Sequence, residues 1–444
     1  MVLPATSRFP GFYRLPMTER RALVAESVGL APELVAAIDG SQGLPSTIAD
    51  KMIENVVGTF SLPIGLGLNF QIDGRDYIVP MVVEEPSIVA AVSNVAQLVR
   101  QCGGFTCHAD PPLMIGQVQL VEVPDPEAAK QRIEAAWPQL KARGDQYAAD
   151  MVRYGGGMRD LEVRLLPDQG DGGGTMLVVH FIVDCRDAMG ANTINSVAEG
   201  LAVDLAELTG GRAVLRILSN LADRRTARAR CRVPVERLRR GSMSGEEVAQ
   251  NILWAYRLAA RDPYRAATHN KGIMNGIDAV AIATGNDWRQ LEAGAHAYAA
   301  RSGQYRSLTR YAVVDGHLEC ELEMPLAVGT VGGSTASHPS VRACREILGV
   351  KDASTLARVL VAVGLAQNLG ALWALASEGI QRGHMELHAQ QIALAAGAPS
   401  DEVESVAREL VRRKEFRVDL AREIWEATRR IGQLGGARVE FAVK

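Results

Sequence analysis

Apolar residues recur along most of the chain with the spacing of three and four that predicts helices. The predicted helices cover residues 17–39, 45–58, 87–100, 126–143, 188–208, 245–261, 276–283, 287–301, 353–375, 379–396 and 400–430. Shorter segments alternate apolar and polar residues, which predicts strands. The predicted strands cover residues 68–72, 77–83, 114–123, 159–166, 175–184, 213–218, 308–314 and 317–324. The sequence therefore predicts an α+β protein.

Predicted strands and helices alternate between residues 111 and 218, whereas long helices dominate the later part of the chain. Two passes of strand and helix are enough to build a compact α/β unit. We therefore expect this segment to be a small unit inserted into a larger, mainly helical one.

Composition narrows the class of protein. With 47% hydrophobic and 22% charged residues, the chain has an ordinary globular composition. Its net charge of −3 argues against nucleic-acid binding, which normally depends on a basic surface. The most apolar segment, 355–376, is interrupted by Arg358, Gln367 and Asn368, so we expect a buried helix and no membrane span. We expect no secretory signal, and the six scattered cysteines favour reduced thiols in a cytoplasm.

Residues 262–276 form a dense polar segment among small residues. Lys271 stands in this segment apart from most other charges, and it could stabilise a carbonyl oxygen that gains negative charge. Arg265 could bind a carboxylate through its planar guanidinium group. A solvated loop is the structural alternative, and the sequence leaves both open.

Two adjacent carboxylates, Glu84 and Glu85, stand between a predicted strand and a helix that begins near Pro86. Because side chains alternate along a strand, one carboxyl group should point toward the core and could deliver a proton. The alternative is a pair that caps the helix and faces water. Asp287 likewise stands where a helix N-cap is expected, which is its structural explanation.

Candidate cofactor and metal segments are less specific. Residues 184–193 join a strand to a long helix, and amides at a helix start can hold a pyrophosphate, but the GxGxxG pattern of a Rossmann site is missing. The glycine-rich segment 329–335 could approach a ligand or form a turn. His384 and His388 lie four residues apart without an HExxH motif, so we expect no metal, and His384 could act as an acid.

Seven segments that occur in one order carry a resemblance to a known family. They are Glu54-Asn-Val-Val-Gly-Thr-Phe60, Glu84-Glu-Pro-Ser87, Asp187-Ala-Met-Gly-Ala-Asn192, His269-Asn-Lys-Gly-Ile-Met-Asn-Gly276, Gly285-Asn-Asp287, Gly329-Thr-Val-Gly-Gly333 and Gly383-His384. Over residues 52–388 the chain resembles hydroxymethylglutaryl-coenzyme A (HMG-CoA) reductases. The expected lack of a membrane anchor makes it similar to the bacterial class II enzymes.

The resemblance implies a role for each matching residue. Glu85 matches the catalytic glutamate, and Lys271 matches the lysine that stabilises the carbonyl oxygen. Asp287 matches the aspartate that links these two, and His384 matches the histidine that protonates the departing CoA thiolate. The residues implied around the HMG group are Arg265, Ser87, Asn275 and Gln367. The residues implied around the dinucleotide are Asp187, Met189, Gly190, Asn192 and Asn220.

The implied reaction interconverts HMG-CoA with mevalonate and CoA through two hydride transfers, with a nicotinamide dinucleotide and no metal. An acidic residue near the adenosine ribose favours NADH, whereas a basic one favours NADPH. The region that should supply it holds Asp145 and Asp150 as well as Arg143 and Arg153, and we favour NADH.

The family's architecture implies three domains. Residues 1–110 and 219–378 would form a large HMG-CoA-binding domain, and residues 111–218 a small non-Rossmann domain that binds the dinucleotide. Residues 379–444 would form a mobile helical flap that carries His384 over the site. The site of such enzymes lies between subunits, which implies a homodimer as the smallest active unit, with a hexamer as a larger option.

Two other functions stay open on the sequence alone. Another acyl-CoA-linked oxidoreductase would not need Arg265 and Asn275 around a second carboxylate. A CoA- or nucleotide-binding protein of the same fold would have lost the chemistry, although all four catalytic positions hold the expected type of residue.

Overall fold

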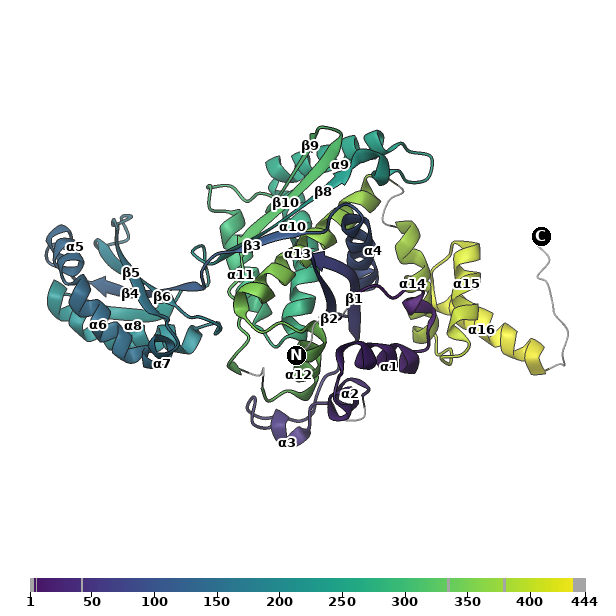
Figure 1. Cartoon of the computed structure of the whole chain (residues 1–444), viewed down its shortest axis with the longest axis horizontal. Coiled ribbons are helices and arrows are strands. Elements are labelled where there is room, and N and C mark those ends of the chain that lie inside the picture. The colour runs from purple at the N-terminus through teal and green to yellow at the C-terminus, as the bar shows by residue number, and fades with distance from the viewer. Residues whose placement is uncertain (1–3, 5, 41–42, 334–335, 378–380, 434–444) are drawn as a thin grey trace.

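The computed structural model describes residues 4, 6–40, 43–333, 336–377 and 381–433, with side chains described throughout except in 381–387 and 430–433. Three units follow one another along the long axis of the molecule (Figure 1). A small unit of strands and helices lies at the left, a large unit with two sheets lies in the middle, and a group of C-terminal helices lies at the right. The chain is a mixed α+β protein, as the sequence predicts.

The large unit contains two antiparallel sheets. β1 (Ile64–Ile72) and β2 (Arg75–Val82) form a hairpin, and the second sheet has the strand order β3-β8-β10-β9. The strands of this second sheet are β3 (Thr106–Ala109), β8 (Thr226–Pro234), β9 (Thr309–Val314) and β10 (His317–Pro325). The helices of the large unit are η1 (Phe12–Arg14), α1 (Met17–Val28), α2 (Pro32–Ile38), α3 (Ser46–Ala49), α4 (Ile88–Arg100), η2 (Val235–Leu238), α9 (Gly245–Arg261), α10 (Pro263–Ala283), α11 (Trp288–Ala299), α12 (Pro339–Leu348) and α13 (Ala353–Leu375).

Helices α4, α10 and α13 pack against one another and against the sheets of the large unit. Their buried side chains, among them Val92, Ile277 and Leu360, belong to one hydrophobic core. α13 is long and apolar enough to cross a membrane, but 78% of its most apolar window is buried inside the protein. It is therefore the buried helix that the sequence predicts.

Several predicted helices are shorter or interrupted. The helix predicted over 17–39 is two helices, because Gly29 takes a left-handed conformation with φ of 65° and ends α1. The segment predicted over 400–430 is interrupted at Lys414, which also has a positive φ, of 57°. The segment predicted over 126–143 is interrupted near Pro138, which has no amide hydrogen to continue the preceding helix. Of residues 45–58, only α3 is helical.

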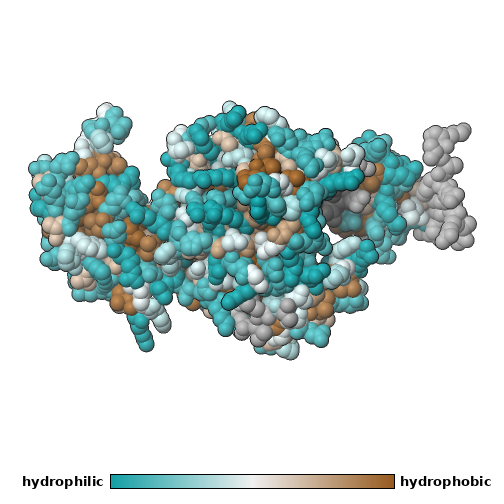
Figure 2. All heavy atoms as spheres, turned by 45° about the horizontal axis from the view of Figure 1, so that its top comes forward, coloured by the Kyte–Doolittle hydropathy of each residue, from teal (hydrophilic) through white to brown (hydrophobic). Residues whose placement is uncertain are grey.

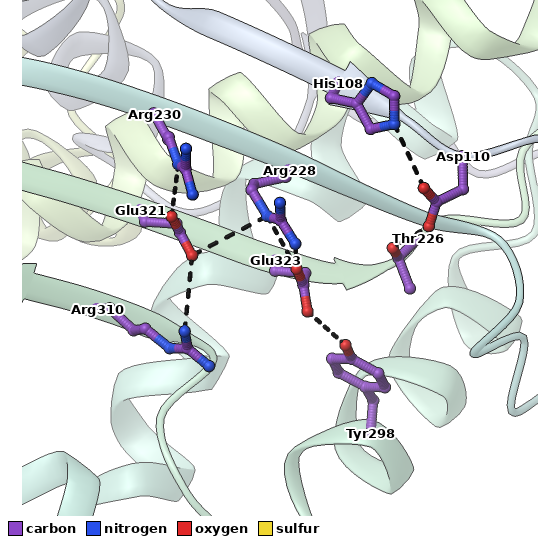
Figure 3. Close-up of polar contacts among 9 residues, drawn as sticks. All are labelled: His108, Asp110, Thr226, Arg228, Arg230, Tyr298, Arg310, Glu321 and Glu323. Atoms are coloured by element: carbon purple, nitrogen blue, oxygen red, sulfur yellow. Dashed lines mark hydrogen bonds and ion pairs between the residues drawn. The ribbon is translucent and has the colours of Figure 1, made fainter.

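Strand β8 was not predicted, because its outward positions are arginines. Arg228, Arg230 and Arg232 stand directly opposite Glu323, Glu321 and Glu319 of β10. Figure 3 shows the first two pairs, and Arg230 Nε lies 2.5 Å from Glu321 Oε2. Opposite charges at facing positions stabilise an antiparallel pair of strands. The partners lie about 90 residues away in the sequence, so the local pattern could not reveal them.

The small unit surrounds a four-stranded sheet with the order β5-β6-β4-β7. Its elements are β4 (Leu113–Val121), α5 (Pro126–Ala135), α6 (Trp137–Tyr147), α7 (Ala149–Arg153), β5 (Gly157–Leu166), β6 (Met176–Asp184), α8 (Ala191–Thr209) and β7 (Arg212–Leu218). All neighbouring strands pair antiparallel, so this is not a Rossmann sheet, in agreement with the missing GxGxxG. Val118, Phe181 and Leu201 belong to a hydrophobic core that is separate from the core of the large unit.

Hydrophilic residues cover most of the face seen in Figure 2, and apolar residues gather on the small unit at the left of that view.

The C-terminal helices α14 (Gln381–Ala395), α15 (Val403–Arg413) and α16 (Val418–Gln433) form the third unit. Their buried side chains, such as Ala393, Leu410 and Ala421, form a small core of their own.

A buried arginine joins the loops between the small and large units. Arg225 donates hydrogen bonds to Ala188 O and Met189 O at 3.2 Å and to Val328 O at 2.5 Å. Burial lowers the pKa of Arg225 to about 10, so the side chain is still a cation at neutral pH. One guanidinium group therefore fixes the start of α8 against the loop that follows β10.

We expect Arg225→Met to lower the free energy of unfolding by about 1–3 kcal/mol, because one buried and two partly buried carbonyl oxygens lose their donor. The matched control is Arg224→Met at the adjacent exposed arginine, whose 3.5 Å contact with Glu162 is worth little, so a change within about 0.5 kcal/mol is expected. Urea unfolding of both variants measures the difference. Equal stability of the two variants would contradict the role of Arg225.

Candidate active site

Glu85 and Lys271 meet although 186 residues separate them in the sequence. Lys271 Nζ donates a hydrogen bond to Glu85 Oε2 at 2.8 Å. Glu85 lies in the turn between β2 and α4, and Lys271 lies on α10, which packs against β2. The neighbouring Glu84 is exposed. Of the two adjacent carboxylates, Glu85 is therefore the one that faces the lysine.

The polar segment 262–276 is the first part of α10 and not a loop. Asp262 caps the helix, since its side chain accepts a hydrogen bond from Arg265 N at 3.0 Å. Lys271 and Asn275 lie four residues apart and so share one face of the helix. This face carries the ammonium group toward Glu85.

The opposite side of α10 is fixed by buried hydrogen bonds. His269 Nε2 lies 2.6 Å from Thr309 Oγ1, and Asn270 Oδ1 accepts from Leu308 N at 3.1 Å. Burial lowers the pKa of His269 to about 3, so this imidazole is neutral at physiological pH and serves packing. Because two adjacent side chains bind the β9 region, the direction of Lys271 is set by the helix and not by its ion pair.

Arg265 is an arginine without a described acidic partner. Its guanidinium group is partly buried, and this burial lowers its pKa. No hydrogen bond or ion pair joins the side chain to any of the described residues. A partly desolvated cation of this kind is suited to bind a carboxylate of a ligand.

Gln367 and Ser87 offer further unused polar groups. Gln367 lies on α13 with 6% of its surface exposed, and its Oε1 has no hydrogen-bond partner among the described residues. α13 approaches α10 closely here, since a Cβ atom on Gly276 would lie 3.0 Å from Gln367 Cβ. Ser87 takes a left-handed conformation before α4, with φ of 72°, and its hydroxyl does not cap the helix. Buried polar groups without partners are expected where a ligand supplies them.

Asp287 caps α11 by accepting hydrogen bonds from the amides of Arg289 and Gln290. It also lies 3.1 Å from Arg289 Nη2. No hydrogen bond or ion pair of the described chain joins it to Glu85 or Lys271. Its capping role is thus a structural fact, whereas its role as a link between these two residues stays a prediction.

Three of the predicted segments meet at the junction of the small and large units. Asp187 O accepts from Thr330 N at 2.8 Å, and Asp187 Oδ1 accepts from Ala353 N at 3.0 Å. Asn286 Oδ1 accepts from Gly329 N at 2.7 Å. A Cβ atom on Gly329 would lie 2.6 Å from the backbone nitrogen of Met189, so only glycine allows this approach.

The remaining predicted cofactor residues surround the same junction. Gly190 precedes α8 with φ of 105°, a conformation that glycine adopts readily, and Asn192 is exposed in the first turn of this helix. Asn220 is exposed, and its carbonyl lies against Gly294 of α11. Backbone amides at the start of a helix are suited to bind the pyrophosphate of a dinucleotide, and glycines there let the protein backbone approach it closely.

His384 belongs to α14, but its side chain lies outside the described residues, so nothing is shown of its contacts. His388 is exposed on the same helix, and its ring lies 6.4 Å from that of Phe416. Among the described residues, no group of three or more His, Cys, Asp or Glu side chains is placed to hold a metal ion.

A polar cluster on α10 and α11 was not predicted from the sequence. Asp278 lies seven residues after Lys271 on α10, and Glu292 and His296 lie on α11, which packs against α10. His296 Nε2 lies 2.5 Å from Glu292 Oε2, and its Nδ1 lies 2.7 Å from the hydroxyl of Tyr305. The helical spacing from Lys271 to Asp278 indicates that the two share one side of α10. Nothing in the sequence indicates that Glu292 and His296 of α11 lie near Asp278.

Known proteins similar to this chain share one family. The family model described as hydroxymethylglutaryl-coenzyme A reductase matches residues 16–389. The chain is 50% identical to the 3-hydroxy-3-methylglutaryl-coenzyme A reductase of Archaeoglobus fulgidus over 96% of this chain and 95% of that protein. It is 36% identical to the probable reductase of Borreliella burgdorferi over 77% of each chain.

Solved structures of the Streptococcus pneumoniae reductase are similar as well. One superposes with a TM-score of 0.81 at 41% identity, covering 95% of this chain and all of that chain. Another, a class II reductase bound to NADPH in open conformations, gives a TM-score of 0.80 at 42% identity over 83% of this chain and 100% of that chain. The chain therefore belongs to the hydroxymethylglutaryl-coenzyme A reductase family, oxidoreductases that interconvert HMG-CoA with mevalonate and CoA.

Proposed function

We propose that the paired Lys271 and Glu85 are the catalytic centre of this reductase. The observation that carries the proposal is the 2.8 Å hydrogen bond between Lys271 Nζ and Glu85 Oε2. It brings an ammonium group and a carboxyl group together. Support comes from the partly buried Arg265 on the same helix and from Gln367 Oε1, which has no partner among the described residues, on the packed helix α13. A carbonyl that becomes an oxyanion needs a cation, and an alkoxide that becomes an alcohol needs a proton donor.

The chain's own residues divide the work as follows. The nicotinamide dinucleotide, when bound, supplies the hydride for each of the two reductions. Lys271 holds the negative charge that develops on the thioester oxygen and later on the aldehyde oxygen. Glu85 delivers the proton that completes the alcohol. His384 gives a proton to the departing CoA sulfur. Asp287 links the charged groups of Lys271 and Glu85.

The remaining residues orient the substrate and the cofactor. Arg265 binds the terminal carboxylate of the HMG group, which distinguishes this substrate from acyl-CoA molecules that lack a second carboxylate. The carboxylate and the hydroxyl group of the HMG moiety also contact Ser87, Asn275 and Gln367. The dinucleotide lies along the start of α8, where its contacts are Asp187, Met189, Gly190, Asn192 and Asn220.

Exchange of the adjacent carboxylates separates their roles. We expect Glu85→Gln to lower kcat for HMG-CoA reduction by about 10²–10³-fold, because the amide cannot give up a proton to the product. Glu84→Gln, one residue earlier and exposed, should change kcat less than about twofold. The oxidation of the reduced nicotinamide, followed by absorbance, measures both.

Lysine variants provide the second arm of this test. Lys271→Ala should abolish turnover while the protein stays folded, whereas Lys130→Ala, at a partly exposed lysine on α5, should remain fully active. Turnover of HMG-CoA by a folded Lys271→Ala variant at the native rate would refute the proposed centre.

We propose that the preferred dinucleotide is NADH and that Asp150 binds its ribose hydroxyl. Asp145 is occupied, since it accepts from Lys141 Nζ at 2.5 Å and from Met158 N at 2.7 Å. Asp150 is exposed on α7, and the turn that follows α7 contacts the end of β6, because a Cβ atom on Gly156 would lie 2.4 Å from Asp184 O. Asp150 precedes this turn along the chain, and an acid at that place would accept from a ribose hydroxyl but repel a phosphate.

We expect Asp150→Ala to lower kcat/KM for NADH about tenfold and to leave kcat/KM for NADPH equal or higher. The exposed Asp168, in the loop between β5 and β6, gives the control Asp168→Ala, which should change neither value. A native protein that uses NADPH better than NADH, as the Streptococcus pneumoniae structure with NADPH would suggest, overturns the preference.

We propose that the active unit is a homodimer, with a hexamer as its higher assembly, in a cytoplasm. The segment after α3 exposes apolar side chains that a single chain leaves in water: Val57 is 104% and Phe60 is 89% exposed. Exposed apolar side chains that gather in one segment are typical of a subunit interface. All six cysteines are free thiols, which suits a reducing compartment.

The proposed domains follow the three units of the structure. Residues 1–110 and 219–378 would bind HMG-CoA, residues 111–218 would bind the dinucleotide, and residues 379–444 would form the flap that carries His384. Separate hydrophobic cores support this division.

A charge in the apolar segment tests the dimer. We expect Val57→Asp to shift the protein toward the monomer in sedimentation velocity and to lose most of its activity, because a buried carboxylate would oppose association. Val203→Asp, at an equally apolar and 64% exposed position on α8, should remain dimeric and active. An active wild-type monomer would contradict the proposal.

A further inference from the structure

Arg225 is a buried cation that binds backbone carbonyls instead of a carboxylate. The residue is 4% exposed. Its Nη1 donates to Ala188 O and Met189 O at 3.2 Å each, and its Nη2 donates to Val328 O at 2.5 Å. Within the described residues these are the hydrogen bonds of its side chain, and none of them goes to an acidic group. Because burial of a charge costs free energy, an apolar side chain would serve packing at least as well at this place.

The segment 187–192, which leads into α8, binds its carbonyl oxygens to the protein and leaves amides unbound. Asp187 O accepts from Thr330 N at 2.8 Å, and the next two carbonyl oxygens along the chain accept from Arg225. The backbone amides of residues 190–192 donate no hydrogen bond within the described chain, as expected where a helix begins. Three consecutive acceptors are therefore occupied, and the three donors that follow them are free to bind a ligand.

Peptide geometry connects these acceptors to these donors. A trans peptide unit is planar, so its carbonyl oxygen and its amide hydrogen point in opposite directions. The bond from Arg225 to Met189 O therefore directs the N–H of Gly190 away from the guanidinium group. If this peptide unit rotated, its carbonyl oxygen would take the place of its amide. Amides at a helix start attract phosphate oxygens, whereas a carbonyl oxygen carries partial negative charge and repels them.

The third bond of Arg225 fixes this segment to the large unit. Val328, whose carbonyl oxygen accepts the bond, belongs to the core of the large unit, whereas its neighbour Ala327 belongs to the core of the small unit. The next amide along the chain, Gly329 N, donates to Asn286 Oδ1 at 2.7 Å. The same guanidinium group therefore holds the start of α8 at a fixed place relative to the unit that carries the proposed catalytic centre.

We propose that Arg225 is a positioning residue for the dinucleotide and acts through the carbonyl groups of Ala188 and Met189. It keeps these oxygens away from the pyrophosphate and holds the free amides of residues 190–192 ready before the cofactor binds. Its positive charge, which no described carboxylate neutralises in an ion pair, adds to the positive end of the α8 dipole. This inference rests on the proposed place of the dinucleotide at the start of α8.

Removal of the guanidinium group should weaken dinucleotide binding in particular. We expect Arg225→Met to raise the dissociation constant of the reduced dinucleotide about 10–100-fold, because the peptide unit before Gly190 can then rotate. Titration of the nicotinamide fluorescence without HMG-CoA measures this constant. In steady-state assays, KM for the dinucleotide should rise to a similar extent. KM for HMG-CoA, and kcat at saturating dinucleotide, should stay within about threefold of the native values.

A merely structural role predicts a different result. A partly unfolded variant contains less active enzyme, which lowers the apparent kcat, but its folded molecules bind the dinucleotide with the native KM. Arg225→Lys is the conservative variant, since its ammonium group keeps the charge and has three donors, and its dinucleotide affinity should be within about fivefold of native. Arg225→Gln, which is neutral and shorter, replaces Arg225→Met in the comparison if the latter does not fold. The exposed neighbour gives the control Arg224→Met, which should bind the dinucleotide as the native protein does.

Asn192→Asp distinguishes failure of this inference from failure of the proposed cofactor site. Asn192 is exposed in the first turn of α8, so a carboxylate there should repel the pyrophosphate and raise KM for the dinucleotide about tenfold. Native dinucleotide affinity in a folded Arg225→Met protein, or an equal rise of both KM values, overturns the role of Arg225 while Asn192→Asp still binds weakly. Native affinity in Asn192→Asp shows instead that the dinucleotide lies elsewhere, and the proposed cofactor site then fails together with the inference.

Discussion

The buried hydrogen bonds that hold one side of α10 determine where its other side can act. His269 and Asn270 bind the β9 region, and the next residue along the helix is Lys271. A partly exposed ion pair such as Lys271–Glu85 adds little to stability, so it does not hold the two elements together. The core positions the pair instead, and the cost of orienting its charges is met during folding, before any substrate binds.

Much of the fold could be predicted from the sequence, because hydrophobic spacing is a local property. The pattern found α9 and α13 with their observed bounds and placed most strands within two or three residues. The predicted helix bounds were wrong where one residue has an unusual backbone conformation. At Gly29 and Lys414 a left-handed residue ends a helix inside a continuing apolar pattern. Strand β8 escaped for another reason, since its arginines are neutralised by glutamates of β10 that only the folded sheet brings near.

Some functional and structural residues of the site could be predicted from the sequence, and others could not. Residues with an unusual chemical type in a distinctive segment, such as Lys271 and Glu85, could be identified and are brought together by the structure. The buried Arg225 could not be separated by pattern from the other 40 arginines of the chain, because its three carbonyl partners come from distant loops. Glu292 and His296 were hidden likewise, since an amphipathic helix with a charged side usually needs no further explanation.

Placing Lys271, Asn275 and Asp278 on one uninterrupted helix restricts how this part of the gene can change length. An insertion or deletion of one codon within α10 would rotate everything beyond it by about 100° and shift it by about 1.5 Å. The lysine would then be out of phase either with the bonds of His269 and Asn270 or with Asp278 and the start of α11. Length variation among related chains should therefore accumulate in loops such as that between β5 and β6, whereas α10 should vary only by substitution.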